Sequence, residues 1–186
     1  GGIQFKQLRT EFMLYFWLVI QFLLVLIFIF AVIQFYDVVF KGLAPFISTS
    51  FRAILIIIKE LNLTGKEKIY ELGSGKAGFL RAVEEKFGNT ELIGIEKSPW
   101  PCLLSKFQIA IVRSRIKVIC KNFFKVNLKD ADVIYCFLNV KMMTALEKKI
   151  KEECRPGTLV ISYCFSMKGM EPEKILKDGL NNIYFY

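Results

Sequence analysis

The sequence predicts an α/β domain, a sheet with helices on both faces, preceded by one transmembrane helix near the N-terminus. Three observations lead to this prediction. A long uncharged stretch lies near the start of the chain, short apolar runs alternate with charged, helix-like segments after Lys68, and a glycine-rich turn follows the first of these runs. A chain of 186 residues has room for one such domain.

The membrane prediction rests on residues 12–36, which contain no charged side chain. As a helix, residues 12–33 would extend roughly 33 Å at about 1.5 Å per residue, enough to cross a bilayer core. Aromatic residues gather near both ends of the stretch, as in the interfacial belts of membrane spans. Two alternatives stay open: a hydrophobic helix buried against a partner, and a helix lying along the membrane surface.

Charges on either side of this stretch predict its orientation. Positive residues are more numerous after it (Lys41, Arg52, Lys59) than before it (Lys6, Arg9). We therefore expect a single-pass membrane protein whose folded domain lies on the cytoplasmic side. The expected division of the chain is an N-terminal segment over residues 1–41 and a domain over residues 42–186.

Periodicity places the elements of the domain. Short apolar runs predict strands over 68–72, 91–96, 117–120, 132–138 and 158–165, and one more over 182–186. Helix-like segments cover about 50–61, 78–87, 99–112 and 140–153, although the apolar run 54–58 equally allows a strand. Because strands alternate with crossover helices, we expect a parallel sheet covered on both faces.

Composition limits the possible chemistry. The chain has no histidine, which excludes His-based general-base catalysis, Ser/His or Cys/His nucleophiles and His-ligated zinc within one chain. A net charge of +9 suits anionic lipid or nucleic acid. The cysteines are odd in number and form no C-x-x-C pair, so we expect no metal site, and reduced thiols serving as small core residues in a cytosolic compartment. They are Cys102, Cys120, Cys136, Cys154 and Cys164.

The first strand runs into a glycine turn over residues 73–78 that matches the dinucleotide fingerprint G-x-G-x-x-G. Glu96 ends the second strand, where a ribose-binding acid belongs. Glu71 allows a choice between two possible classes of cofactor, because a carboxylate at this position would hold the cationic amino group of a methionine moiety but repel a pyrophosphate. The pattern favours S-adenosylmethionine over a nicotinamide dinucleotide.

Two residues after the third strand could contact the adenine of such a cofactor. Asn122 could pair with the adenine edge while Phe123 packs on the ring. The alternative is equally open at each position, since Asn is a common turn residue and Phe a common core residue.

From Pro45 onward the sequence resembles class I, seven-β-strand methyltransferases. More narrowly, it resembles the membrane-anchored lysine N-methyltransferases that act on the ATP synthase c-subunit and the adenine nucleotide translocase. The resembling segments are Ala-Pro-Phe-Ile-Ser-Thr-Ser at 44–50, Glu-Leu-Gly-Ser-Gly at 71–75, Gly-Ile-Glu-Lys-Ser-Pro-Trp at 94–100, and the Met-Met-containing run at 140–149. The resemblance implies a Rossmann-like methyltransferase sheet, S-adenosylmethionine as cofactor and lysine methylation.

Together with the glycine pattern, the resemblance gives the expected cofactor-binding residues: Glu71, Gly73, Ser74, Gly75, Gly78, Glu96, Lys97, Asn122 and Phe123. The chain departs from the family at Lys76, where Asp is usual, which moves two charge units next to a cationic cofactor. It also has Asn122 where Asp is common. The C-terminal tail is short for the last two strands of a complete sheet.

Methyl transfer from a sulfonium is an in-line displacement, so alignment of acceptor and methyl group is the main requirement and no covalent residue is needed. We expect the acceptor site to be formed by Pro45, Phe46, Thr49, Phe137, Leu138 and Asn139. Asn139 could hold the acceptor amine through its carbonyl oxygen, or be a plain turn residue.

The function expected is a membrane-anchored protein-lysine N-methyltransferase whose partners are the bilayer and a membrane protein with an accessible lysine. A lipid-amine or small amphipathic-molecule methyltransferase is the first alternative. A catalytically inactive, membrane-tethered cofactor-binding module is the second. Nucleic acid is not expected as a partner, because basic residues are spread along the chain and no Asn-Pro-Pro-aromatic segment follows the fourth strand.

Overall fold

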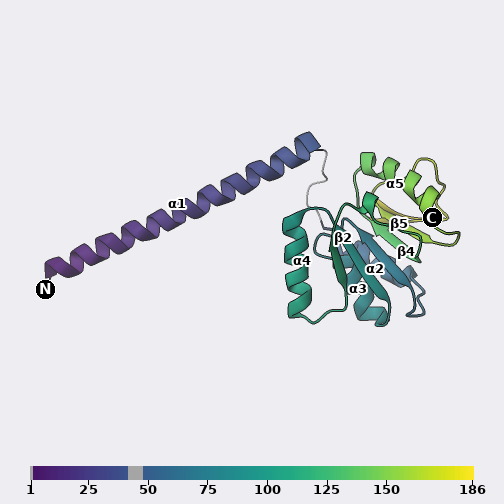
Figure 1. Ribbon diagram of the computed structural model, residues 1–186, viewed down its shortest axis with the longest axis horizontal. Helices are drawn as coiled ribbons and strands as arrows, with labels where there is room; N and C mark the ends of the chain where they lie inside the picture. Colours follow the sequence, from purple (N-terminus) through teal and green to yellow (C-terminus); the bar gives the residue numbers. More distant parts are fainter. Residues whose placement is uncertain (1, 42–47) are drawn as a thin grey trace. The chain divides into compact units, whose positions relative to one another are not determined.

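The computed structural model describes residues 2–41 and 48–186, and the chain divides into two compact units, Gly1–Pro45 and Phe46–Tyr186 (Figure 1). Pro45 and Phe46, which were expected at the acceptor site, lie outside the described residues. The first unit contains a single described helix, and the second contains the sheet.

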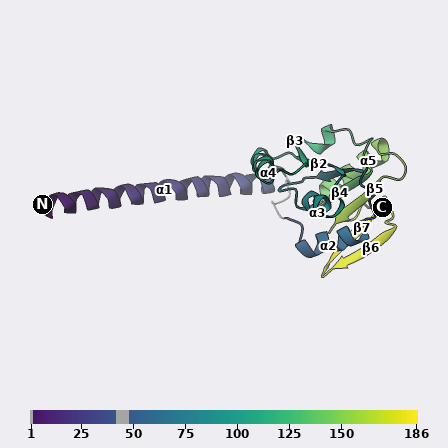
Figure 2. The same ribbon diagram turned by 90° about the horizontal axis from the view of Figure 1, so that it is seen from below.

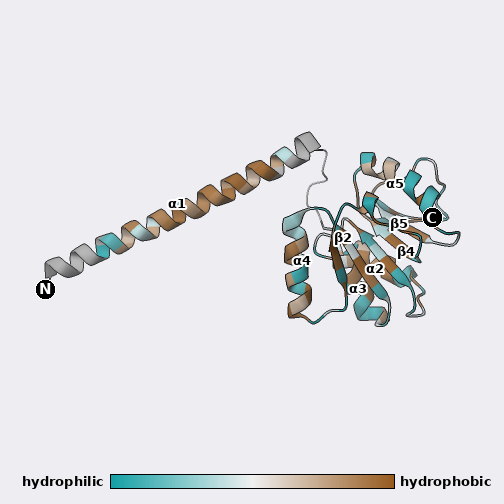
Figure 3. Ribbon diagram, viewed as in Figure 1, coloured by the Kyte–Doolittle hydropathy of each residue, from teal (hydrophilic) through white to brown (hydrophobic). Residues whose placement is uncertain are grey.

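Helix α1 covers Gly2–Lys41 and is 40 residues long. Its segment Glu11–Ile33 is long and apolar enough to cross a membrane. The side chains of this segment are exposed in every direction around the helix axis, and Figure 3 shows no polar stripe along its middle. A helix that is apolar on all sides is typical of a membrane span or of a deeply buried core helix. The helix predicted over 12–36 is present and continues beyond both ends.

The second unit is built on a seven-stranded sheet in the order β3-β2-β1-β4-β5-β7-β6, which Figure 2 shows from β3 on one side to β6 on the other. The first five strands are parallel, as predicted, whereas β7 is antiparallel to both β5 and β6. The strands are β1 (Lys68–Leu72), β2 (Glu91–Glu96), β3 (Lys117–Cys120), β4 (Val133–Cys136), β5 (Leu159–Tyr163), β6 (Lys174–Asp178) and β7 (Asn181–Phe185).

The C-terminal tail forms both final strands, so the expectation that it is too short for them is wrong. Strand β6 escaped prediction because Lys174 and Lys177 interrupt its apolar residues, as is common in edge strands. The turn is only two residues long, and Gly179 adopts a φ of +62°, which glycine allows without strain. The sequence signal for this hairpin is a glycine at the first of the two turn positions, Gly179.

Helices cover both faces of the sheet. On one face, α2 (Phe51–Glu60), α3 (Gly78–Phe87) and α4 (Pro99–Ile111) enclose the first core. On the other face, α5 (Val140–Glu153) and the 3-10 turn η1 (Phe123–Lys125) enclose the second core. The apolar run 54–58 is helical, because its isoleucines at 54, 57 and 58 follow helical spacing and are buried against the sheet.

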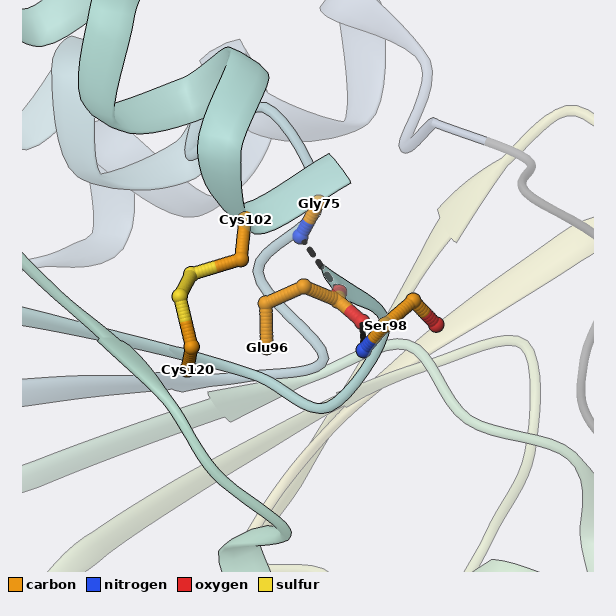
Figure 4. Close-up of a disulfide and its surroundings, with 5 residues drawn as sticks. All are labelled: Gly75, Glu96, Ser98, Cys102 and Cys120. Atoms are coloured by element: carbon orange, nitrogen blue, oxygen red, sulfur yellow. Dashed lines mark hydrogen bonds between the residues drawn. A yellow bond between two sulfur atoms is a disulfide. The ribbon is translucent and has the colours of Figure 1, made fainter. Parts of the chain in front are cut away.

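One prediction about the cysteines is wrong, because Cys102 and Cys120 form a disulfide (Figure 4). The β2-α4-β3 crossover returns the chain so that the first turn of α4 lies beside the end of β3. This brings the two Cα atoms to 5.7 Å, within the range of disulfides. No sequence motif marks a pair 18 residues apart, since the fold creates their proximity. Cys136, Cys154 and Cys164 are free thiols, as predicted, and burial raises the pKa of Cys136 to about 12.

Candidate functional site

The glycine turn lies at the carboxyl edge of the sheet, where it folds over the end of β2. The backbone N–H groups of Gly73 and Ser74 both donate to the Ile95 carbonyl oxygen, at 2.8 and 3.1 Å. Gly73 and Gly75 adopt φ angles of +72° and +49°. These left-handed conformations favour glycine, and a Cβ at Gly73 would also come within 3.2 Å of the Leu138 side chain.

A second glycine requirement lies beneath the turn, in the middle of β2. A Cβ on Gly94 would lie 2.8 Å from Ser74 Oγ and 3.0 Å from Ser74 Cβ. The bare backbone at Gly94 therefore lets the turn sit close against the sheet. Ser74 itself is buried, and its hydroxyl has no hydrogen-bond partner among the described residues.

Glu71 is buried one residue before the end of β1. Burial raises the pKa of this carboxyl to about 8, although backbone N–H groups at the start of α3 and the charge of Arg81 oppose the shift. The N–H of Leu80 donates to Glu71 Oε2 at 3.4 Å. The side chain is therefore largely neutral at pH 7, and a cation placed beside it would favour its ionisation.

Glu96 is a second buried carboxylate, at the end of the neighbouring strand. Its Oε2 accepts a hydrogen bond from the Gly75 N–H at 3.0 Å, and its Oε1 accepts one from the Ser98 N–H at 2.7 Å (Figure 4). Glu96 thus ties the glycine turn to the entry of α4. Each carboxylate oxygen retains capacity for a further donor, such as a ligand hydroxyl.

The other expected cofactor residues lie on the elements that follow. Lys97 is exposed directly after Glu96, and Gly78 is the exposed first residue of α3. Asn122 is half-buried and caps η1, since its Oδ1 accepts from the Phe124 N–H at 3.1 Å. Phe123 is only 4% exposed, and its ring lies in the second core with its centroid 4.3 Å from that of Phe124.

Of the expected acceptor residues at the end of β4, Leu138 lies against the glycine turn. Leu138 is buried against Gly73, and the Phe137 ring meets the Tyr163 ring edge-on at 4.9 Å. Asn139 caps α5, because its Oδ1 accepts from the Met142 N–H at 2.9 Å. The carbonyl oxygen that was expected to hold an acceptor amine thus already serves the helix.

Thr49 enters the site through a residue that the sequence did not single out. Its Oγ1 lies 2.6 Å from the hydroxyl oxygen of Tyr135, a buried residue of β4 whose ring packs against Phe79 at 4.2 Å. Burial raises the pKa of Tyr135 well above its ordinary value, so the phenol stays protonated. The chain segment before α2 is thereby attached to the centre of the sheet.

A second set of hydrogen bonds anchors the same segment at the far edge of the sheet. Ser50 Oγ donates to Asp178 Oδ2 at 2.6 Å, and the Tyr163 hydroxyl donates to the same oxygen at 2.9 Å. These bonds and the nearby Arg52 guanidinium hold the pKa of Asp178 below its ordinary value. Ser50 also caps α2, since its Oγ accepts from the Ala53 N–H at 3.0 Å, and no local sequence pattern indicates its long-range partner Asp178.

The arrangement fits a ligand that carries both a cation and hydroxyl groups. Two buried carboxylates from adjacent strand ends accept backbone N–H groups of this region, Glu96 from Gly75 in the turn and Glu71 from Leu80 in α3. A cation placed beside Glu71 would stabilise its ionised form and lower its pKa, and a buried ion pair is weakly screened by solvent. S-adenosylmethionine, with its amino group, sulfonium and ribose, has these features.

Known proteins are similar to this chain over the region that contains the glycine turn and Glu96. Residues 71–174 match the model of the family described as the ANTKMT methyltransferase domain. A protein-lysine N-methyltransferase of Saccharolobus islandicus is 25% identical over 148 residues, which cover 76% of this chain and 92% of that protein. The adenine nucleotide translocase lysine N-methyltransferase of Mus musculus is 25% identical over 145 residues, covering 76% of this chain but only 62% of the relative.

Among solved structures, an RNA methyltransferase from Salinibacter ruber in complex with S-adenosyl-L-homocysteine superposes with a TM-score of 0.70. The alignment covers 75% of this chain and 92% of the other at 20% sequence identity. At this identity the similarity concerns the fold, and it agrees with the seven-stranded sheet of residues 68–185.

Proposed function

Because the chain belongs to the ANTKMT methyltransferase domain family, and is thereby an S-adenosylmethionine-dependent methyltransferase, we propose that it methylates a lysine of a membrane protein while anchored in the bilayer. The family and the protein-lysine relatives support the reaction. The apolar segment of α1 supports the anchoring. In this proposal residues 1–41 are the anchor segment and residues 42–186 the catalytic domain.

The single observation that carries the cofactor assignment is the pair of buried carboxylates beside the glycine turn. Glu71 would hold the amino group of the methionine moiety, and Glu96 would accept hydrogen bonds from the ribose hydroxyls. Gly73 and Gly75 give the ligand access to the backbone. Asn122 and Phe123 are proposed at the adenine side, where the Asn122 amide nitrogen can still donate.

The bound cofactor supplies an electrophilic methyl group on a positively charged sulfur. The protein's task is to orient an acceptor amine in line with that group and to exclude water. A lysine with an ordinary pKa of about 10.4 must first lose its proton, which an apolar site favours. Phe137, Leu138 and the Thr49–Tyr135 pair form the apolar, fixed surface that we propose for the acceptor side chain.

Labelled cofactor tests the proposed reaction. The full chain, purified in detergent and reconstituted with native membranes, is incubated with cofactor carrying a labelled methyl group. We expect label in membrane protein that yields methyl-lysine on acid hydrolysis. Label confined to the lipid extract would favour a lipid-amine methyltransferase instead, and cofactor binding without transfer to any acceptor would favour the inactive module.

A matched pair of variants separates the cofactor site from general effects of charge. Glu96→Gln removes the carboxylate beside the glycine turn, whereas Glu85→Gln makes the same change on an exposed position of α3. Loss of the ribose contacts should weaken cofactor binding by about tenfold or more in Glu96→Gln, since hydrogen bonds to charged groups contribute roughly 1.5–3 kcal/mol. Equal affinities for the two variants would contradict the assignment of Glu96.

We propose the cytoplasmic side for the catalytic domain, on the basis of the positive residues that follow the apolar stretch. The Cys102–Cys120 disulfide is more typical of an oxidising compartment, so the orientation needs its own test. A protease added to intact cells should leave the domain uncut. The same protease added to inverted membrane vesicles should release the domain. The opposite pattern would place the domain outside.

A further inference from the structure

Helix α4 is apolar on two opposite sides. Cys102, Ser105 and Ile109 face the sheet and are buried. On the opposite side a second apolar row, Trp100, Leu103, Phe107 and Ile111, is 60–64% exposed. Spacings of three and four residues align these four side chains along the whole helix, and Figure 3 shows hydrophobic residues on α4 at the margin of the domain. A surface helix normally carries polar residues on the side that faces away from the core, so an exposed apolar row on that side is unusual.

The segment that contains the row carries a surplus of positive charge. The segment from Lys97 to Lys129 contains eight Lys and Arg residues and no Asp or Glu, so it holds nearly all of the chain's surplus of +9. All eight are exposed: Lys97, Lys106, Arg113, Arg115, Lys117, Lys121, Lys125 and Lys129. Basic residues are spread along the whole chain, as expected, but acidic residues balance them in number everywhere outside this segment.

We infer that the exposed row of α4 lies in the headgroup region of an anionic membrane, as a second contact beside the anchor. An apolar helix face with Trp, Phe and Leu, bordered by Lys and Arg, is the composition of interfacial helices that bind anionic lipid. Each basic residue near such a surface adds about 1 kcal/mol of attraction, or about fivefold in binding. The inference deepens the proposed function and rests on its membrane anchoring.

Other partners fit the row less well. Single-stranded nucleic acid would use stacking surfaces, but Leu103 and Ile111 offer none. A second copy of this chain would bring its own basic segment against this one, and like charges repel. The chain itself limits the distance to the bilayer: even fully extended at about 3.5 Å per residue, residues 34–50 span at most about 60 Å between the apolar segment of α1 and the start of α2.

Docking of α4 has a consequence for the cofactor site. The helix begins three residues after Glu96, and the disulfide joins its first turn to the end of β3. Trp100, at the start of the exposed row, is therefore close along the chain to Glu96 at the rim of the site. A membrane contact through this row holds the rim near the headgroups, where a lysine of a membrane protein would be presented.

Tryptophan fluorescence tests the contact directly, because the chain has only two tryptophans, Trp17 in α1 and Trp100 in α4. The full-length Trp17→Phe variant leaves Trp100 as the sole reporter. It is reconstituted into vesicles of phosphatidylcholine with or without phosphatidylglycerol, each containing lipids brominated close to the headgroup. We expect quenching of Trp100 in the anionic vesicles and much less in the neutral ones.

Charge variants on the same background supply the control. Lys106→Glu with Arg113→Glu replaces two positive charges beside the row with two negative ones, and Lys141→Glu with Lys177→Glu makes the same change at exposed positions elsewhere. The first pair should lower the ratio of docked to undocked domain by at least about 25-fold, at about fivefold for each residue. The second pair should leave quenching close to that of the parent.

Several results would overturn the inference. If no brominated lipid quenched the emission of Trp100, the row would not lie in the membrane. Equal quenching in neutral and anionic vesicles would exclude the role of the basic residues. Quenching by added polyuridylate in detergent, or protection by dimer formation, would assign the row to RNA or to a second copy. Flotation with the vesicles is measured on the same samples, so failure of the anchoring is distinguished from failure of α4 docking, and the assay requires neither cofactor nor acceptor.

Discussion

Replacing Glu71 with Gln should stabilise the cofactor-free protein, although it removes a residue of the cofactor site. In the folded chain burial raises the pKa of Glu71 from an ordinary 4.5 to about 8. The folded state therefore binds more protons than the unfolded state between these values, and stability falls as the pH rises from 4.5 through 8. At 1.36 kcal/mol per pH unit, ionisation of the unfolded carboxyl costs the wild type about 1 kcal/mol at pH 5 and about 3 kcal/mol at pH 7.

The glutamine amide has nearly the same shape as the neutral acid and does not titrate. The melting temperature of Glu71→Gln in detergent should therefore exceed that of the wild type by about 6–12 °C at pH 7, from about 2–4 °C per kcal/mol for a chain of this size. The difference should shrink to a few degrees at pH 5. Glu85→Gln, on an exposed position, serves as the control and should melt as the wild type does. A Glu71→Gln protein no more stable than the wild type at pH 7, or a difference independent of pH, would show that Glu71 is not held neutral in the folded chain.

Three further changes probe the same domain. Cys120→Ser opens the disulfide and should lower the free energy of unfolding by about 3 kcal/mol in urea titrations, as expected for a loop of this length, whereas Cys154→Ser should not; equal effects would contradict the disulfide. Gly94→Ala places a Cβ against Ser74 and should weaken cofactor binding in calorimetry by about 1–3 kcal/mol. Unchanged affinity would show that the glycine turn can shift away from the added Cβ without loss of cofactor binding. Tyr135→Phe removes the hydrogen bond to the segment before α2, so kcat should fall about fivefold at unchanged cofactor affinity, and a parallel loss of affinity would contradict a role confined to the acceptor side.

Much of the sheet was predictable because its first five strands are short apolar runs separated by helices with clear boundaries. Helix α3 begins at Gly78 and ends at Phe87, as the glycine turn and periodicity predict. Strand β6 was not predictable from apolar periodicity, because an edge strand needs few buried side chains and Lys174 and Lys177 interrupt it.

The site was predictable where its chemistry is local in sequence. The sequence alone identifies Glu71, the glycine turn and Glu96, because acidic and glycine residues stand there at the ends of apolar runs. The Thr49–Tyr135 hydrogen bond joins residues 86 positions apart, and the disulfide also depends on the packing of α4 against β3. Such contacts depend on three-dimensional packing that no local pattern reports.

In the proposed site Glu71 ionises to hold the cationic amino group of S-adenosylmethionine. Calorimetric titration of the full chain with the cofactor between about pH 6 and 7.5, in buffers of different ionisation enthalpy, measures the protons released on binding. With a free pKa of about 8 that falls in the complex, affinity should rise about 25-fold over this interval, with close to one proton released. An affinity that stays constant over the interval, with no proton released, would contradict the account.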